Sequence, residues 1–279
     1  MQQVLINTLT LYEVFAYFFL YSFLGWVTEV AFHAITMGKF VNRGFLNGPV
    51  CPIYGTGVVV ILLLLGEWVE KPWLVLLVGI ALPTLIEFVT GWALETFFHN
   101  KWWDYSGRKF NVKGYICLEF SLLWGIAVLA VVEVVHPAVR WFAGLFGEIA
   151  GDVLVGLCAA AMIADLVVTI MQVLKLNRKL KELDEVAKKM RAGSDFIGEK
   201  VANVTLKAEA GFAAVKETLS EKRERAIDAI AAKMPARLLN AFPHLKSRNH
   251  PGSVELARES VSRLKRKKKE KADDSQEEK

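Results

Sequence analysis

Five stretches of the sequence are apolar and long enough to cross a lipid bilayer as helices. They cover approximately residues 11–36, 52–69, 73–98, 115–135 and 152–174, and the second, with the run VVVILLLL at its centre, is the shortest. A hydrocarbon core of about 30 Å requires roughly 20 residues of α-helix. The sequence therefore predicts an all-α, polytopic membrane protein with about five transmembrane helices.

The charged residues divide the chain into two parts. Through residue 174 there are 8 Lys and Arg against 12 Asp and Glu, a net charge of −4. From residue 175 onward the remaining 26 and 17 give +9, and the two parts add to the +5 of the whole chain. This division predicts a transmembrane bundle over 1–174, an amphipathic helical cytoplasmic segment over 175–242 and a basic, mostly disordered tail over 243–279.

Positive residues in the loops predict the orientation of the bundle. The first and third loops carry six of them, Lys39, Arg43, Lys101, Arg108, Lys109 and Lys113, whereas the second and fourth carry only Lys71 and Arg140. Because cytoplasmic loops are richer in Lys and Arg, we expect loops one and three in the cytoplasm. Five spans then place the N-terminus outside and the C-terminal tail inside a multi-pass protein of the plasma membrane.

Carboxylates inside the predicted spans are the candidates for function, because charges in lipid are costly and usually face a protein interior or water. At about 1.5 Å per residue, four of them lie between the bilayer middle and the cytoplasmic face, namely Glu29, Glu87, Glu119 and Asp165. Helical spacing adds His33 to the face of Glu29 and Glu95 to the face of Glu87. We expect a cytoplasm-facing acidic pocket that binds a cation or a small polar solute. The alternative is that each acid is only structural.

A segment rich in turn-forming residues, NRGFLNGPVCPIYGTG, connects the first two spans at 42–57. Its prolines exclude a regular helix and its glycines permit close backbone approach. Non-helical backbone at membrane depth is tolerated only where protein or water surrounds it. We therefore expect the segment to fold back to the acidic pocket and to bring Asn42, Arg43, Asn47 and Tyr54 as hydrogen-bond donors; an ordinary surface loop is the alternative.

Aromatic and polar residues alternate in the loop between the third and fourth spans. Trp102, Trp103 and Tyr105 suit the membrane interface, where amphipathic rings are enriched. Asp104 and Asn111 are expected either to cap helix ends or to complete the pocket.

Residues 137–149, between the fourth and fifth spans, mix large aromatic side chains such as Trp141 and Phe142 with small residues. This pattern suits a short helix in the outer membrane interface. A connecting loop with aromatic contacts fits it equally well, and in both cases the fourth span is expected to end near residue 135.

Two features of the tail predict binding surfaces. Apolar residues recur every three or four positions at Leu176, Leu180, Leu183, Ala187 and Met190. This heptad rhythm predicts a helix that packs either on the protein's own cytoplasmic surface or in an intermolecular coiled coil. The basic run RLKRKKKEK at 263–271 is expected to hold anionic lipid headgroups, and nucleic-acid binding is not expected, because no aromatic residues interleave these charges.

Sequence motifs of enzymes and of metal or nucleotide sites are absent from the chain. There is no G-x-x-x-x-G-K-[ST], G-x-S-x-G or H-E-x-x-H motif, and the cysteines have no C-x-x-C spacing. We therefore expect no catalytic residues, no metal and no cofactor. Without a phosphate-binding loop, the chain alone cannot energise transport by nucleotide hydrolysis.

Several blocks of the sequence resemble a known bacterial membrane family. They are FLGWVTE (23–29), NRGFLNGPVCPIYGTG (42–57), EFVTGWALETFF (87–98), WWDYS (102–106), NVKGYICLEFSLLWG (111–125) and HP (136–137). These blocks are similar to the group catalogued as putative ABC-transporter permeases, type IV or CmpB-like, and MPARLLNAFPHLKS (234–247) also resembles a segment of that family. The resemblance implies a permease component in a bacterial cell membrane, working with a separate ATPase subunit.

Three functions of different classes follow from these observations. The first is a transport component whose pocket binds a cation or a small polar solute. The second is a membrane scaffold whose tail recruits partners, with structural acids in the bundle, and the third is an intramembrane lipid-modifying enzyme. An odd number of spans is also compatible with a homo-oligomer.

Overall fold

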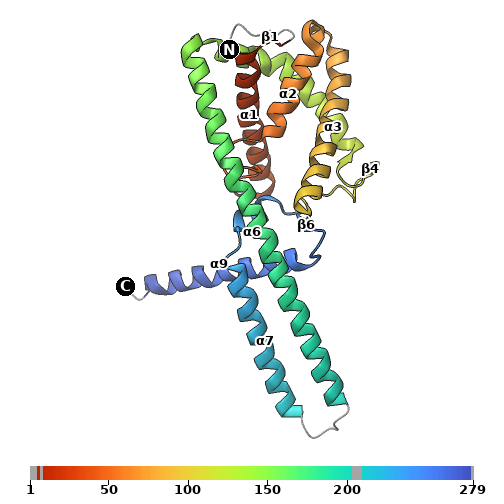
Figure 1. The fold of residues 1–279 in the computed structure, drawn as a ribbon, viewed down its shortest axis with the longest axis vertical. Helices are drawn as coiled ribbons and strands as arrows, with labels where there is room; N and C mark the ends of the chain where they lie inside the picture. Colours follow the sequence, from red (N-terminus) through yellow and green to blue (C-terminus); the bar gives the residue numbers. More distant parts are fainter. Residues whose placement is uncertain (1–4, 7–8, 203–208, 278–279) are drawn as a thin grey trace. The chain divides into compact units, whose positions relative to one another are not determined.

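The computed structural model describes residues 5–6, 9–202 and 209–277 (Figure 1). The chain divides into two compact units. Unit 1 comprises Met1–Phe97, Lys101–Met171 and Asn240–His244, and unit 2 comprises Phe98–Asn100, Gln172–Leu239 and Leu245–Lys279.

Unit 1 is built almost entirely of helices. A short antiparallel hairpin of β1 (Leu5–Ile6) and β2 (Leu9–Thr10) precedes them. The helices are α1 (Leu11–Met37), α2 (Pro52–Leu65), a 3₁₀ turn (Gly66–Glu70), α3 (Pro72–Phe98), α4 (Leu118–Ala130), a π turn (Val131–Val135), α5 (His136–Gly144) and the first part of α6 (Glu148–Ala202). Between α3 and α4 lie β3 (Asn100–Lys101) and an antiparallel hairpin of β4 (Asn111–Val112) and β5 (Ile116–Cys117).

Four helices in the described part of the chain are long and apolar enough to cross a membrane. They lie in Leu11–Met37, Pro72–Phe98, Leu118–Gly144 and Ile149–Met190. The fifth apolar helix, α2, has 14 residues, or about 21 Å, which is shorter than a hydrocarbon core of about 30 Å. The chain is thus an all-α polytopic membrane protein, as predicted, and the helix expected at 52–69 is shorter than a full span.

Local sequence signals set both ends of α1. At its start, Thr10 and Glu13 form a capping box, in which the Thr10 hydroxyl accepts from the Glu13 N–H at 3.2 Å and the Glu13 carboxylate accepts from the Thr10 N–H at 2.8 Å. At its end, Gly38 adopts a left-handed conformation with φ of 66°. Glu13 is therefore accounted for as a capping residue.

α1 and α2 pack closely through two glycines. A Cβ atom added to Gly55 would lie 2.2 Å from the carbonyl oxygen of Phe18 and 2.3 Å from the hydroxyl of Ser22. A Cβ atom on Gly25 would lie 2.3 Å from the Tyr54 ring. The apolar core beside this contact consists of Tyr12, Ala16, Tyr17, Tyr21, Val59, Leu62, Val139, Ala143 and Val155.

The segment between α1 and α2 runs back along α1. The N–H of Cys51, which directly precedes α2, donates to the carbonyl of Ser22 at 2.8 Å. Ser22 lies 15 residues before Met37, which corresponds to about 22 Å of helix. α2 therefore begins level with the middle of α1. The segment folds back into the bundle, as its proline and glycine pattern predicts, and this explains why α2 is short.

The helix that contains the fourth span is longer than expected. Instead of ending near residue 135, the helix continues through the π turn into α5, so that one helical segment covers Leu118–Gly144. Pro137 has no N–H to donate, and the helix accommodates it with a wider turn in which the His136 N–H donates to the carbonyl of Val131. The short helix predicted from residue 137 onward is present as α5, continuous with the helix before it, and its place in the outer membrane interface stays a prediction.

Unit 2 contains the polar part of α6 together with α7 (Glu209–Ala231), most of α8 (Ala236–Ala241), β6 (Lys246–Ser247) and α9 (Ser253–Glu277).

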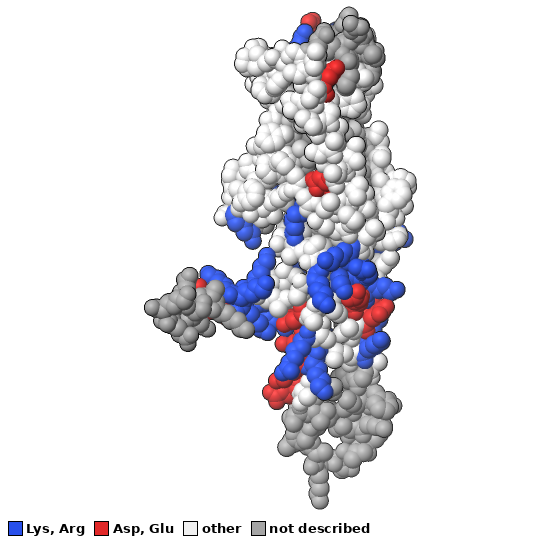
Figure 2. All heavy atoms as spheres, turned by 60° about the vertical axis from the view of Figure 1, so that its left-hand side comes forward, with Lys and Arg blue, Asp and Glu red and all other residues white. Residues whose placement is uncertain are grey.

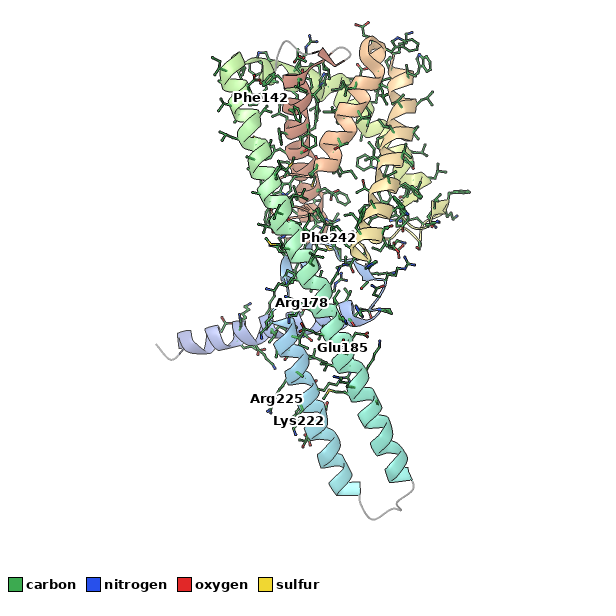
Figure 3. All side chains as sticks on the ribbon, viewed as in Figure 1. Phe142, Arg178, Glu185, Lys222, Arg225 and Phe242 are labelled. Carbon is green, nitrogen blue, oxygen red and sulfur yellow. The ribbon has the colours of Figure 1, made fainter. Side chains whose placement is uncertain are left out.

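The apolar residues predicted to form one face of α6 are buried within the chain, with Leu176, Leu180 and Leu183 each 0% exposed. Of the two alternatives for this stripe, packing on the protein's own surface agrees with the structure. Charged side chains such as Arg178, Glu185, Lys222 and Arg225 line these helices (Figures 2 and 3), whereas the visible face of the transmembrane helices is nearly free of charge.

The last helix differs from the predicted disorder of 243–279. α9 forms because one of its faces has partners, with Val254, Ala257 and Val261 buried. Ion pairs add to this, since Arg263 lies 3.0 Å from Glu224 of α7. The expectation of disorder is wrong for Ser253–Glu277, because single-sequence composition does not reveal these long-range contacts.

Candidate polar site in the transmembrane bundle

Glu29 on α1 is at the centre of a polar cluster. The hydroxyl of Tyr54, in the first turn of α2, donates to Glu29 Oε1 at 2.6 Å. The Nε atom of Arg43 lies 3.6 Å from Oε2, and the side chain of Glu29 is 31% exposed. His33 is buried one helical turn further along α1. A carboxylate with one short hydrogen bond and one distant cation retains capacity for a further ligand.

Arg43 is held by a segment from far along the sequence. Its guanidinium donates to the carbonyl of Ala241 and lies 6.0 Å from the ring of Phe242. The ring of Phe242 packs edge-on against Trp102 at 4.8 Å. Trp102 is only 3% exposed and also contacts Phe45 at 5.1 Å. Trp102 is thus a packing residue, and its expected role as an interfacial anchor is wrong.

Asn42 and Asn47 belong to the non-helical segment between α1 and α2 (residues 38–51), here called the re-entrant segment. They hold its shape and do not contact Glu29 directly. Asn42 accepts from the indole N–H of Trp26 at 2.8 Å and donates to the carbonyl of Asn47 at 2.7 Å. Asp165 of α6 accepts from the backbone and side-chain amides of Asn47 at 3.1 and 2.8 Å and from the Gly48 N–H at 2.7 Å. Three amide donors occupy this carboxylate, so Asp165 fixes the segment against α6.

Glu87 of α3 forms a second, more deeply buried group and is 8% exposed. It accepts from the hydroxyl of Tyr105 at 3.0 Å and from the indole N–H of Trp124 at 3.3 Å. The ring of Trp124 packs edge-on against Tyr54 at 5.5 Å. Aromatic contact therefore links the Glu87 group to Tyr54, the residue that binds Glu29.

The remaining predicted residues make local contacts outside these two groups. Glu95 accepts from the hydroxyl of Tyr115 at 2.8 Å, Asp104 lies 2.9 Å from Lys101, Asn111 donates to the carbonyl of Arg108 at 2.7 Å, and Glu119 lies 3.1 Å from Arg108. Glu119 is 54% exposed. The structure thus joins Glu29, Arg43 and Tyr54 directly, relates Asn42, Asn47 and Asp165 to them through the re-entrant segment, and connects Glu87 through an aromatic ring.

Three aromatic donors to the predicted carboxylates do not follow from the sequence. Tyr105 is expected there at the membrane interface, and the sequence predicts no role for Trp124 and Tyr115. They lie 18, 37 and 20 residues from the carboxylates that they bind. The sequence indicates such donors only through their residue type, because Tyr and Trp carry a polar group that needs a hydrogen-bond partner when buried.

The chemistry of the site is that of a polar binding site with one partly exposed carboxylate beside one guanidinium. Within the described ranges, no group of three or more His, Cys, Asp and Glu side chains is arranged to hold a metal ion. Cys51 and Cys117 are free and buried. The arrangement can bind a cation at Glu29, or a small solute that hydrogen-bonds to both Glu29 and Arg43.

Comparison with known proteins places the chain in a family. The model of the family described as putative ABC-transporter type IV matches residues 16–170, which is more than half of the chain. The chain belongs to this family. The match covers most of α1, all of α2 to α5 and most of the apolar part of α6, and so includes every predicted site residue, as the resemblance of the sequence blocks implied. The curated proteins and the solved structures gave no match.

Proposed function

We propose that this protein is the membrane component of a transporter, and that Glu29, with Arg43 and Tyr54, is the centre of a site that binds a cation or a small polar solute. The family description and the four spanning helices support a transport role. The cluster around Glu29 supports the choice of site.

The observation that carries the proposal is the incomplete coordination of Glu29. Asp165 is occupied by three amide donors and Glu87 by two half-buried donors, whereas Glu29 has one hydroxyl at 2.6 Å and a guanidinium at 3.6 Å. A charged group at membrane depth is costly unless water or a ligand reaches it. Its 31% exposure therefore favours a ligand-binding role over a purely structural one.

The re-entrant segment gives independent support. α2 begins beside Ser22, at the middle of α1, and its first turn supplies Tyr54 to the site. Discontinuous helices that begin near the bilayer midplane are typical of solute sites in transporters, because their free backbone groups and terminal dipoles can serve a ligand.

The orientation follows from the charges of the loops. Loops one and three, which carry six of the eight cations before residue 175, lie in the cytoplasm of the bacterial cell, with the N-terminus outside and the tail inside. Arg43 of loop one and Tyr105 of loop three then bring the site toward the cytoplasmic face. Energy for transport comes from a separate ATPase subunit, since this chain has no phosphate-binding loop.

A matched pair of variants tests the site. Glu29→Gln and Glu119→Gln remove the same charge, but only Glu29 belongs to the polar cluster. The thermal midpoint of the full chain in nanodiscs is measured with sodium, potassium, magnesium and a panel of small polar solutes. We expect a stabilising probe to raise the midpoint of the wild type and of Glu119→Gln, and to leave Glu29→Gln unchanged, because binding to the folded state stabilises it. A shift retained in Glu29→Gln would remove Glu29 from the site.

The partner is tested separately by gentle affinity purification of the full chain from native membranes. We expect an ATPase with a phosphate-binding loop to be recovered at near-stoichiometric yield. Its reproducible absence would contradict the ABC-type energy coupling while leaving the binding site to be judged by the glutamine variants.

A further inference from the structure

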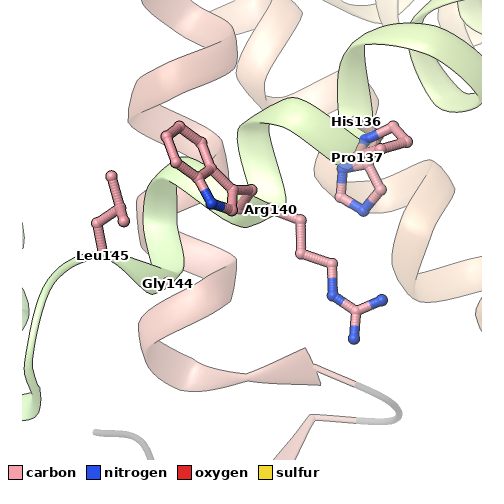
Figure 4. A pocket seen from close by; sticks show the side chains of 6 residues that line it. His136, Pro137, Arg140, Gly144 and Leu145 are labelled. Carbon is pink, nitrogen blue, oxygen red and sulfur yellow. The ribbon is translucent and has the colours of Figure 1, made fainter.

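The block His136–Pro137 has no part in the proposed solute site, although it belongs to the blocks that carry the family resemblance. It forms one wall of a shallow open depression of about 630 Å³ on α5 (Figure 4). The lining residues are His136, Pro137, Arg140, Trp141, Gly144 and Leu145.

The imidazole of His136 is fixed from the side of α1. Its Nδ1 lies 3.0 Å from the hydroxyl of Tyr21, and its ring packs edge-on against Tyr17 at 5.1 Å. With Nδ1 engaged by Tyr21, the other ring nitrogen, Nε2, is left for a partner outside this contact. The depression thus has a polar wall that is already ordered.

Arg140 brings a positive charge to the same site. It follows His136 by four residues, so both project from one side of α5, and its guanidinium extends away from the helix (Figure 4). Arg140 makes no ion pair with any acid in the described part of the chain. The other cation in the loops predicted to lie outside, Lys71, instead lies 4.7 Å from the ring of Trp68.

The depth of the depression matches the headgroup layer of a membrane. The helical segment that carries it starts at Leu118, and at about 1.5 Å per residue His136 lies about 27 Å and Arg140 about 33 Å further along. A hydrocarbon core measures about 30 Å, so we expect these two residues at its far boundary if the helix enters the core near Leu118. Trp141 and Leu145 are 68% and 58% exposed there, where amphipathic rings and apolar groups meet lipid.

We propose that this depression binds the phosphate group of a membrane phospholipid. Arg140 and His136 contact the phosphate, a charge-assisted interaction that is strong when the guanidinium has no competing acid. Trp141 and Leu145 lie against the glycerol and the upper part of the acyl chains. The site is independent of the solute site around Glu29 and would lie at the opposite face of the membrane.

The test is titration of phosphatidylglycerol into the delipidated full chain in a mild detergent, with bound lipid counted by native mass spectrometry. We expect Arg140→Gln to weaken binding about tenfold or more, since it removes the charged contact. Lys71→Gln is the matched control, because it removes one positive charge from the other loop on this side but touches no lining residue, and its affinity should equal that of the wild type.

Additional measurements distinguish a phospholipid headgroup from free inorganic phosphate as the ligand. Inorganic phosphate in large excess should not displace the lipid, and Trp141→Ala should weaken phosphatidylglycerol binding, because the apolar part of the ligand contributes. Arg140→Lys, which keeps the charge, should bind several-fold more tightly than Arg140→Gln and shows whether a loss reflects charge or misfolding. Equal affinity of Arg140→Gln and the wild type would overturn the proposal, and displacement by inorganic phosphate would assign the site to the free anion.

Discussion

At the scale of single residues, the carboxylates of the bundle are bound mainly by neutral aromatic donors. Tyr54 donates to Glu29, Tyr105 and Trp124 donate to Glu87, and Tyr115 donates to Glu95. A hydroxyl or indole N–H satisfies a carboxylate without bringing a second charge into the bundle, where each charge costs desolvation energy. The sequence showed the acids, but their donors become evident only in the folded chain.

Removing one such donor should destabilise the bundle. In Tyr105→Phe, the buried Glu87 retains only the indole of Trp124, and we expect a loss of about 1–3 kcal/mol, the cost of a buried polar group left short of a partner. Tyr115→Phe is the control, because Glu95 is less deeply buried than Glu87. Thermal unfolding of both variants in detergent measures the difference. A smaller loss for Tyr105→Phe than for Tyr115→Phe would show that burial of the acid does not set the cost.

Among the helices, two features form the site: the close approach of α1 and α2, and the non-helical segment that precedes α2. α2 is short because the residues before it cover the remaining depth of the bundle as non-helical chain. Its first turn can bring Tyr54 to Glu29 because Gly25 and Gly55 have no side chains that would keep α1 and α2 apart. Small residues have this role in membrane helix packing generally.

Substitution of Gly55 by alanine tests this packing. The new Cβ atom would lie 2.2 Å from a backbone oxygen that cannot move without shifting α1, so we expect destabilisation of about 1–3 kcal/mol. Gly57→Ala in the same helix meets nothing within 4 Å and should be neutral or slightly stabilising, because alanine favours the helix by about 1 kcal/mol. The thermal midpoints of the two variants measure the difference in stability. An equal effect at both positions would contradict a close α1–α2 contact at Gly55.

At the scale of the whole molecule, segments distant in sequence complete each unit. Asn240–His244 belongs with the transmembrane helices, where Ala241 and Phe242 hold Arg43. In unit 2, the ion pairs between α7 and α9 use only part of the basic run, since Arg263 and Lys267 face Glu224 and Asp228. Lys265 and Lys268 are among the exposed cations that remain, and we expect these to bind anionic lipid headgroups.

Two double variants with equal charge changes test whether the exposed cations of α9 bind lipid more strongly than those paired with acids. Lys265→Gln with Lys268→Gln should weaken the binding of anionic vesicles by the full chain in phosphatidylcholine nanodiscs about tenfold or more, at about 1 kcal/mol per cation. Arg263→Gln with Lys267→Gln should weaken it less, because these side chains are engaged by acids. Co-flotation with phosphatidylglycerol vesicles measures both, and equal losses would mean that net charge alone governs binding.

The class of fold, the family and the position of most helices can be predicted from the amino-acid sequence. Apolar windows of about 20 residues leave the helix as the structure that satisfies their backbone in lipid, and Pro49, Pro52 and the nearby glycines mark where a helix cannot continue. The folded chain was needed to show which donor binds which acid, that Asp165 accepts from residues 117 and 118 positions away, and that residues 253–277 form a helix. Helical periodicity specifies which face a residue occupies, whereas the pairing of faces depends on how the helices pack against one another.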